Sequence, residues 1–268
     1  MARSLETRSL DRGLAILNSL SIHGASSLQN LHARTGLPKS TIRRLLGTLI
    51  HRKIVRRSLG DQLYRANISL PFQDTFGSAQ SEAWLVDRAA PHMIELTRSV
   101  GWSCDLHIFE RTTSRIIEST RPLSPFFQIK RQIDLEVPVF AAAAGLAVLS
   151  TWTDRAVLAL ADEIGDDPAL GLCRLGMGKQ SLLSTLQRVR TLGYAIRASQ
   201  YRGKYPDEMN AIARPVFRRR IAVGALVILW PRGYLAPERF SGIHLTRFSE
   251  TTTAISADLT HMDEQLRS

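Results

Sequence analysis

The segment TGLPKSTIRRLLGTLIHRKIVRR, residues 35–57, decides the fold of the N-terminal quarter of the chain. It opens on Thr35-Gly36, where a glycine can end one helix in the left-handed conformation, and Pro38 follows with a fixed φ that suits the first turn of the next. The helix predicted from Pro38 to Ile50 has apolar residues at i, i+3, i+4 and i+7, which indicate one buried stripe: Ile42, Leu45, Leu46 and Leu49.

The remaining surface of this predicted helix carries hydrogen-bond donors in its first two turns and no acidic residue: Lys39, Ser40, Thr41, Arg43 and Arg44. A tight glycine turn between two helices, with donors near the N-terminus of the second, is typical of a recognition helix that enters the major groove of DNA. We therefore expect these five side chains to contact DNA.

Two helices are predicted before this segment. Residues 9–20, SLDRGLAILNSL, place apolar side chains at helical spacing behind Ser9, whose hydroxyl can cap the first turn; they are Leu10, Leu14, Leu17 and Leu20. A shorter helix is expected from Ser26-Ser27 to Thr35, with Leu28 and Leu31 facing inward.

A β-hairpin is predicted after the recognition helix, because residues 54–57 and 62–65 flank the glycine-containing turn 58–61. Such a hairpin is the wing of a winged helix-turn-helix. Arg56, Arg57 and Arg65 lie on or beside it, where guanidinium groups suit phosphates or a narrow minor groove.

The charge of the chain is concentrated in this region. Residues 1–65 contain twelve Lys and Arg against three Asp and Glu, a net +9, whereas the whole chain of 268 residues carries +11. A single arginine is more often a solvated surface charge, but the joint pattern of helices, basic hairpin and charge favours a polyanion partner, double-stranded DNA.

Length and composition predict two globular domains, because 268 residues with 44% hydrophobic and 22% charged side chains can bury a substantial core. The sequence has no apolar stretch long enough for a membrane helix. Its N-terminus has no apolar core like that of a signal peptide. Its two cysteines, Cys104 and Cys173, exclude a disulfide framework. We expect a cytoplasmic protein with no membrane association, no metal and no cofactor.

The rest of the chain predicts a helix followed by an α+β domain. Residues 80–100 have helical periodicity, and Pro91 either kinks that helix or divides it. Period-two alternation begins near Ser103, strands are expected at 116–117, 126–129, 194–196, 210–217 and 222–230, and helices from about Ala142, Thr153 and Lys179. A C-terminal helix of about 20 residues completes the domain. The expected limits are 1–70 for the winged helix-turn-helix, 71–100 for the linker helix and 101–268 for the second domain.

Both halves resemble the IclR family of bacterial transcription regulators. The N-terminal resemblance rests on SLDRGLAILNSL (9–20) and GLPKST (36–41), and it implies that Arg12 binds phosphate. The C-terminal resemblance rests on residues 137–145, 192–195 and 211–217 and implies a GAF/PAS-like mixed α/β effector-binding domain. Residues 100–105, 118–120 and 201–203 look closer to the branch that regulates catabolism of hydroxyphenylpropionate and related aromatic acids.

The resemblance also implies a pocket for a small carboxylate effector, lined by Phe126, Ile129, Ala143, Ala144, Met209, Ala211, Val227 and Leu229. Some relatives that bind glyoxylate-sized acids have serines where this chain has Val227 and Leu229, and polar groups left unpaired against these would cost about 1–3 kcal/mol each. We therefore expect a hydrophobic, aromatic carboxylate. Its acid group is expected at the amides of Ala143 and Ala144, in the 140–145 segment FAAAAG, whose small side chains could instead simply pack a helix on a sheet.

Arg121, Arg197, Arg202 and Lys204 are further candidate anchors for the acid group. Each alone is more often a surface charge.

Enzyme signatures are weak. Cys104 and His107 lie three apart on a predicted strand, which directs them to opposite faces. Residues 175–181 lack the glycine and the Ser or Thr of a phosphate-binding loop. The favoured hypothesis is a ligand-responsive regulator of a catabolic operon, a homodimer or homotetramer on a pseudo-palindromic operator; a DNA-binding structural protein without ligand and an enzyme fused to a DNA-binding domain remain as alternatives.

Overall fold

The structure is a computed structural model that describes residues 8–67, 78–126, 133–198 and 209–265. The chain divides into two compact units, Met1–Asp87 and Arg88–Ser268, each of which is described by itself. The boundary between them falls inside helix α4 (Ser78–Val100). The domain limits expected at residues 70 and 100 stay predictions.

The first unit begins with three helices, α1 (Arg8–His23), α2 (Leu28–Thr35) and α3 (Lys39–His51). The Ser27 hydroxyl caps α2 by accepting a hydrogen bond from the Asn30 amide, 3.1 Å away. Gly36 ends α2 with φ of +68°, a left-handed conformation in which glycine is unstrained. Pro38 precedes the first residue of α3.

The hairpin expected after α3 is present as β1 (Val55–Arg57) and β2 (Tyr64–Ala66), paired antiparallel. Ser26, in the connection before α2, forms a bridge with Tyr64 through two backbone hydrogen bonds of 3.0 and 2.9 Å. The α1–α2 connection is thus attached to the wing through a single-residue β-bridge.

The core of the first unit differs from the expected one in α1. Leu17 and Leu20 are buried, but Leu10 and Leu14 are 62% and 50% exposed. Ile16 lies inside instead, because the buried stripe of α1 runs along its C-terminal half, where α2, α3 and the wing contribute the rest of the core. The buried members of this core are Ile16, Leu17, Leu20, Leu31, Ile42, Leu46, Val55 and Tyr64.

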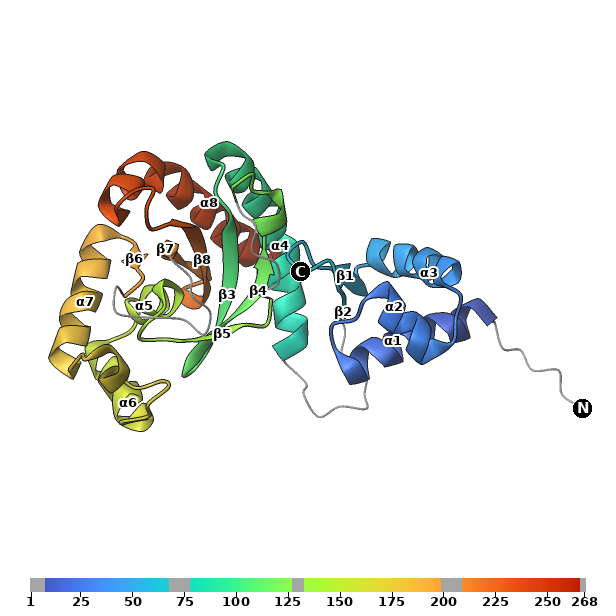
Figure 1. The fold of residues 1–268 in the computed structure, drawn as a ribbon, viewed down its shortest axis with the longest axis horizontal. Coiled ribbons are helices and arrows are strands. Elements are labelled where there is room, and N and C mark those ends of the chain that lie inside the picture. Colours follow the sequence, from blue (N-terminus) through green and yellow to red (C-terminus); the bar gives the residue numbers. More distant parts are fainter. Residues whose placement is uncertain (1–7, 68–77, 127–132, 199–208, 266–268) are drawn as a thin grey trace, which may run out of the picture. The chain divides into compact units, whose positions relative to one another are not determined.

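The second unit is built on a six-stranded antiparallel sheet with the order β5-β4-β3-β8-β7-β6 (Figure 1). Its strands are β3 (Cys104–Glu110), β4 (Thr113–Ser119), β5 (Glu136–Pro138), β6 (Ala195–Ile196), β7 (Met209–Arg218) and β8 (Ile221–Pro231). Gly224 lets β8 approach β3, since a Cβ there would lie 2.1 Å from the His107 carbonyl oxygen.

Helices cover both faces of this sheet (Figure 1). One face packs on α5 (Ala143–Leu149), with α6 (Asp154–Ile164) and α7 (Lys179–Leu192) beyond it. The other face packs on α8 (Pro237–Gln265). The C-terminal part of α4 joins that side, where the His92 Nε2 and a carboxylate oxygen of Asp258 in α8 are 2.9 Å apart.

The winged helix-turn-helix and the α+β second domain are confirmed, with local differences. α4 continues through Pro91 as one helix, so the alternative in which Pro91 divides the helix is excluded. α8 has 29 residues where about 20 were expected. Phe126 lies in a turn rather than a strand, and 127–132 lie outside the described residues. Short 3-10 helices at Arg121–Leu123 and Leu172–Leu175 complete the elements.

Candidate DNA-binding surface and effector site

The turn before α3 is held by side chains as well as by Gly36. The Thr35 hydroxyl donates to the Leu31 carbonyl at 2.7 Å, and the His32 Nδ1 lies 2.7 Å from the Leu37 carbonyl oxygen. The Arg34 guanidinium donates to the Ser26 hydroxyl at 2.9 Å. The contacts of Thr35 and His32 hold the end of α2 and the turn after it, and the contact of Arg34 ties α2 to the α1–α2 connection.

The side chains that the sequence predicts to contact DNA lie on the outer face of α3. Lys39, Ser40, Arg43 and Arg44 are exposed, Thr41 is partly exposed, and Ile42 and Leu46 face the core. The first turn has no acidic residue, and Pro38 caps it without a side-chain hydrogen bond. Free amides at a helix N-terminus together with exposed cations make a surface suited to phosphate. Arg12 is also exposed, on α1.

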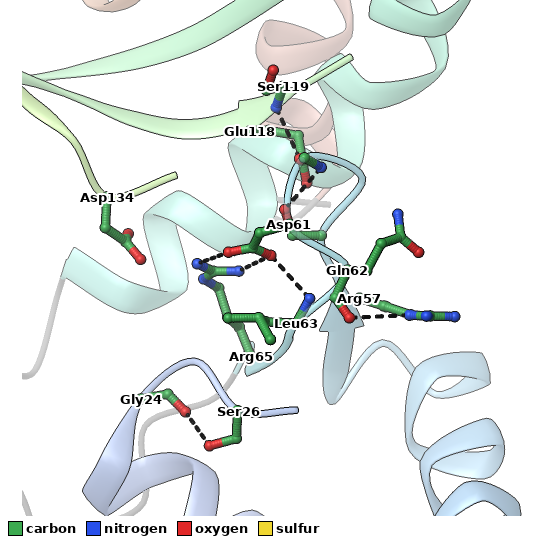
Figure 2. Close-up of polar contacts among 12 residues, drawn as sticks. Gly24, Ser26, Arg57, Asp61, Gln62, Leu63, Arg65, Glu118, Ser119 and Asp134 are labelled. Atoms are coloured by element: carbon green, nitrogen blue, oxygen red, sulfur yellow. Dashed lines mark hydrogen bonds and ion pairs between the residues drawn. The ribbon is translucent and has the colours of Figure 1, made fainter. Parts of the chain in front are cut away.

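The three wing arginines occupy different environments, and Figure 2 shows two of them, Arg57 and Arg65. Arg57 is exposed; its Nε donates to the Gln62 carbonyl at 3.2 Å, and its guanidinium carbon lies 5.5 Å from the centre of the Tyr64 ring. Arg56 is partly buried and donates to the Asn67 side-chain oxygen at 3.3 Å. Arg57 therefore remains a candidate for phosphate contact.

The expected DNA contact of Arg65 is wrong. It is 8% exposed, and its two terminal nitrogens donate to the two Asp61 carboxylate oxygens at 3.0 and 2.8 Å (Figure 2). Asp61 also accepts from the Leu63 amide at 2.9 Å. Burial alone would raise the pKa of Asp61, but the hydrogen bonds from Arg65 and Leu63 outweigh it and lower that pKa below 3.8. Arg65 therefore closes the wing turn rather than presenting its charge to DNA.

In the second unit, five of the expected effector residues are packed into the core between α5 and the sheet. Ala143, Ala144, Ala211, Val227 and Leu229 each expose less than a tenth of their surface. Their apolar character is as expected, and they line the same face of the sheet. Met209 is buried beside them and also borders a cavity near α7.

The small residues at the start of α5 serve close packing, and the binding of an acid group by the amides of Ala143 and Ala144 stays a prediction. α5 has only seven residues, and the amides of Ala141 and Ala142 already donate to the Pro138 carbonyl at 3.2 and 3.1 Å. A Cβ at Gly145 would lie 2.2 Å from the Val139 carbonyl oxygen. The small residues therefore permit a close approach of α5 to the preceding backbone, which is the packing alternative.

Phe126 and Arg121 lie away from their expected roles. Phe126 is 60% exposed, and its ring centre is 4.9 Å from that of Trp102. Arg121 is buried in a bidentate ion pair with Asp105, with nitrogen–oxygen distances of 3.2 and 2.6 Å. The Arg121 guanidinium is therefore committed to Asp105 and is not an effector anchor. Arg197 borders the cavity that Met209 reaches, whereas Ile129, Arg202 and Lys204 lie outside the described residues.

Cys104 and His107 do not form a nucleophile–base pair. The Cys104 thiol lies against Thr97 and Thr120 at 3.6 and 3.3 Å, whereas the His107 Nδ1 lies 3.3 Å from the Ser114 hydroxyl. Burial raises the pKa of Cys104 to about 12 and lowers that of His107 to about 4. Both groups therefore stay neutral near pH 7.

In the part of the chain that the structure describes, histidine, cysteine and acidic side chains form no group of three suited to a metal ion. Within the same residues, no helix has the length and apolar character needed to cross a membrane.

Sequence reasoning missed two site features. Arg188 and Arg232 border the cavity beside Met209, although neither was nominated. Asp61 was overlooked as the partner of Arg65, although an acid and a base four residues apart across a hairpin turn signal such a pair.

Each unit of the chain matches the sequence model of a known domain family. Residues 9–58 match the sequence model of the IclR helix-turn-helix domain, and residues 78–257 match that of the bacterial transcriptional regulator IclR C-terminal domain.

Solved structures with the same fold are similar over nearly the whole chain. An IclR family transcriptional regulator from Brucella abortus is 19% identical, with a TM-score of 0.54 and coverage of 96% of this chain and 94% of that one. HmgR of Pseudomonas aeruginosa is 20% identical, with a TM-score of 0.52 and coverage of 94% and 98%. An IclR homologue from Microbacterium hydrocarbonoxydans, complexed with 4-hydroxybenzoate, is 19% identical, with a TM-score of 0.51 and coverage of 94% and 98%.

Proposed function

The chain belongs to the IclR family of bacterial transcriptional regulators, and on that premise we propose that it controls a catabolic operon by binding operator DNA in a ligand-dependent way. The observation that carries the proposal is the outer face of α3, where Lys39, Arg43 and Arg44 are exposed beside an N-terminus without acidic residues. Arg12 and Arg57 supply further exposed cations on α1 and the wing.

The chemistry of each side chain on this surface indicates whether it contacts bases or phosphates. Ser40 and Thr41 on α3 carry hydroxyls suited to base edges, and Lys39 and Arg44 suit either phosphates or guanine. We assign Arg57 to backbone phosphate. Because each protomer would read one half-site, a homodimer or homotetramer on a pseudo-palindromic operator fits the family.

The effector is a small carboxylate with a hydrophobic, aromatic body. Support comes from the apolar residues Val227 and Leu229 on the α5 face of the sheet, both buried, and from the homologue complexed with 4-hydroxybenzoate. A hydroxyl-rich acid of two carbons would leave its polar groups without partners against apolar surroundings of this kind. The effector acts through its different affinities for the DNA-binding and non-binding arrangements of the protein.

One experiment tests the whole proposal. The wild-type protein selects duplexes from a random-sequence pool, and its affinity for the selected duplex is measured against salt with and without aromatic acids. We expect log K to fall linearly with log salt, by about 0.9 per phosphate neutralised, and one acid class to change K at constant salt. Salt-independent affinity contradicts DNA regulation, and turnover of the acid, detected by mass spectrometry, indicates a fused enzyme.

A further inference from the structure

A cavity in the second unit has the chemistry of an acid-binding site, and of the described residues expected at the effector site only Met209 and Arg197 border it. Its volume is about 510 Å³, within the range of about 300–1,000 Å³ of small-molecule sites. Its walls come from α5, α7, β6, the start of β7 and the turn between β8 and α8.

One side of this cavity is apolar. Leu146 reaches it from α5, Val189 and Leu192 from α7, and Ile196 and Met209 from the sheet edge. Val189 and Met209 are buried, so this wall is continuous with the core that holds Ala143, Val227 and Leu229. A flat apolar body would replace water against these side chains.

Three arginines also line this cavity. Arg188, Arg197 and Arg232 border the cavity together with a single carboxylate, Glu238. Arg188 and Glu238 are 3.2 Å apart and neutralise one another. The described lining therefore has a formal excess of two positive charges, which favours an anion over a neutral or cationic molecule.

Arg232 supplies the most specific signal. Its Nε atom is buried, and among the described residues it has no hydrogen-bond partner. A buried donor without a partner costs about 1–3 kcal/mol, so native proteins rarely leave one unless a ligand or water satisfies it. Arg232 follows β8 directly, and the backbone there is fixed because Pro231 pairs with Met209 and its carbonyl accepts from the Tyr234 amide.

We propose that this cavity is the effector site, with the carboxylate of an aromatic or aliphatic acid bound by Arg232 and its apolar body against Leu146, Val189 and Met209. The inference rests on the proposed function, whose effector it locates. It places the acid group at the β8–α8 turn and away from the amides of α5. A guanidinium that donates through Nε and a terminal nitrogen matches the two carboxylate oxygens.

The test uses the full-length protein and named probes: benzoate, 3-phenylpropionate and hexanoate, with benzamide as the uncharged match for benzoate. Binding is measured by thermal shift and by isothermal titration. We expect at least one acid to raise the Tm of the wild type, and benzamide to leave it unchanged. Arg232→Ala should weaken that acid at least tenfold, since a hydrogen bond to a charged group contributes about 1.5–3 kcal/mol.

Two further variants separate this cavity from the α5 position. Thr185→Trp places an indole in the cavity from a partly exposed position on α7 and should abolish binding. Arg155→Ala removes an exposed arginine of α6 that does not border the cavity and should bind like the wild type.

The two modes of failure are distinct. Wild-type affinity in both Arg232→Ala and Thr185→Trp overturns the cavity assignment and leaves the proposed regulator intact. A wild type that binds none of the three acids at millimolar concentration contradicts the cavity and the acid-sensing part of the proposed function together, while DNA binding is judged separately by its salt dependence.

Discussion

Arg65 and Asp61 form a bidentate ion pair inside the wing turn, with nitrogen–oxygen distances of 3.0 and 2.8 Å and side chains that are 10% and 6% exposed. A buried pair of this kind is vulnerable to the loss of one partner, because the other is left as an uncompensated charge. Because the pair lies inside the wing turn, it stabilises the folded wing.

Asp61→Ala should therefore lower the free energy of unfolding by about 3 kcal/mol, the cost of a broken buried pair, as measured by urea unfolding of the full-length protein. Arg57→Ala, which removes an exposed arginine of the same hairpin, should cost less than about 1 kcal/mol. Because the pKa of Asp61 is lowered, the stabilisation is present above pH 3.8 and is lost as the pH falls through the lowered pKa. Equal stability of the two variants would contradict the structural role.

Substitutions on α3 should change the salt dependence of DNA binding. Lys39→Ala combined with Arg44→Ala should weaken binding and reduce the log–log salt slope by up to about 1.8, which is 0.9 for each lost phosphate contact. Arg155→Ala on α6 removes an exposed charge of the same sign and should leave the slope unchanged. Unchanged slope and affinity in the double variant would reject α3 as the DNA-binding element.

Gly145→Ala should destabilise the second unit. The new methyl group would meet the Val139 carbonyl oxygen at 2.2 Å and the Val139 Cα at 2.4 Å, and overpacking against backbone costs about 1–3 kcal/mol or more. Gly47→Ala is the matched control, because Gly47 is exposed in α3 with open space around it, and there alanine should add up to about 1 kcal/mol. Thermal unfolding measures both; if Gly145→Ala retains the wild-type Tm, the close approach is not required.

The stability of the protein should depend on the protonation of His107. Burial lowers its pKa from 6.5 to about 4, while the neighbouring Asp105 opposes and Arg121 reinforces that shift. The unfolded chain therefore binds a proton first, and the contribution of His107, up to about 3 kcal/mol, is present above pH 6.5 and lost as the pH falls to 4.

His107→Gln removes this titration and should flatten the Tm–pH curve between pH 6.5 and 4, whatever its effect on Tm at neutral pH. Parallel curves for the wild type and the variant would show that His107 is not the group responsible.

The DNA-binding half could be predicted nearly element by element because its signals are local. Gly36, Pro38 and the spacing of Ile42 and Leu46 each act within a turn or two, and the structure contains them as expected. Leu10 was misjudged because helical periodicity identifies an apolar face without revealing whether another element covers it.

The effector half could be predicted in its secondary structure but not in its polar contacts. Arg121 pairs with Asp105 only because β3 and β4 are neighbours in the sheet, which brings the turn after β4 next to Asp105. Arg188 and Arg232 reach one cavity from α7 and from the turn after β8, 44 residues apart in the numbering. Periodicity carries no information about contacts between distant segments, so of the described residues expected at the effector site only Met209 and Arg197 border this cavity.

The bridge between Ser26 and Tyr64 sets the smallest fragment that could fold as the DNA-binding unit. A truncation before residue 64 would leave the amide and the carbonyl of Ser26 without their partners, even though all three helices would be present. The hairpin is thus an integral part of the helical fold. Its amide protons should exchange with solvent as slowly as the amide protons of the segment that connects α1 and α2.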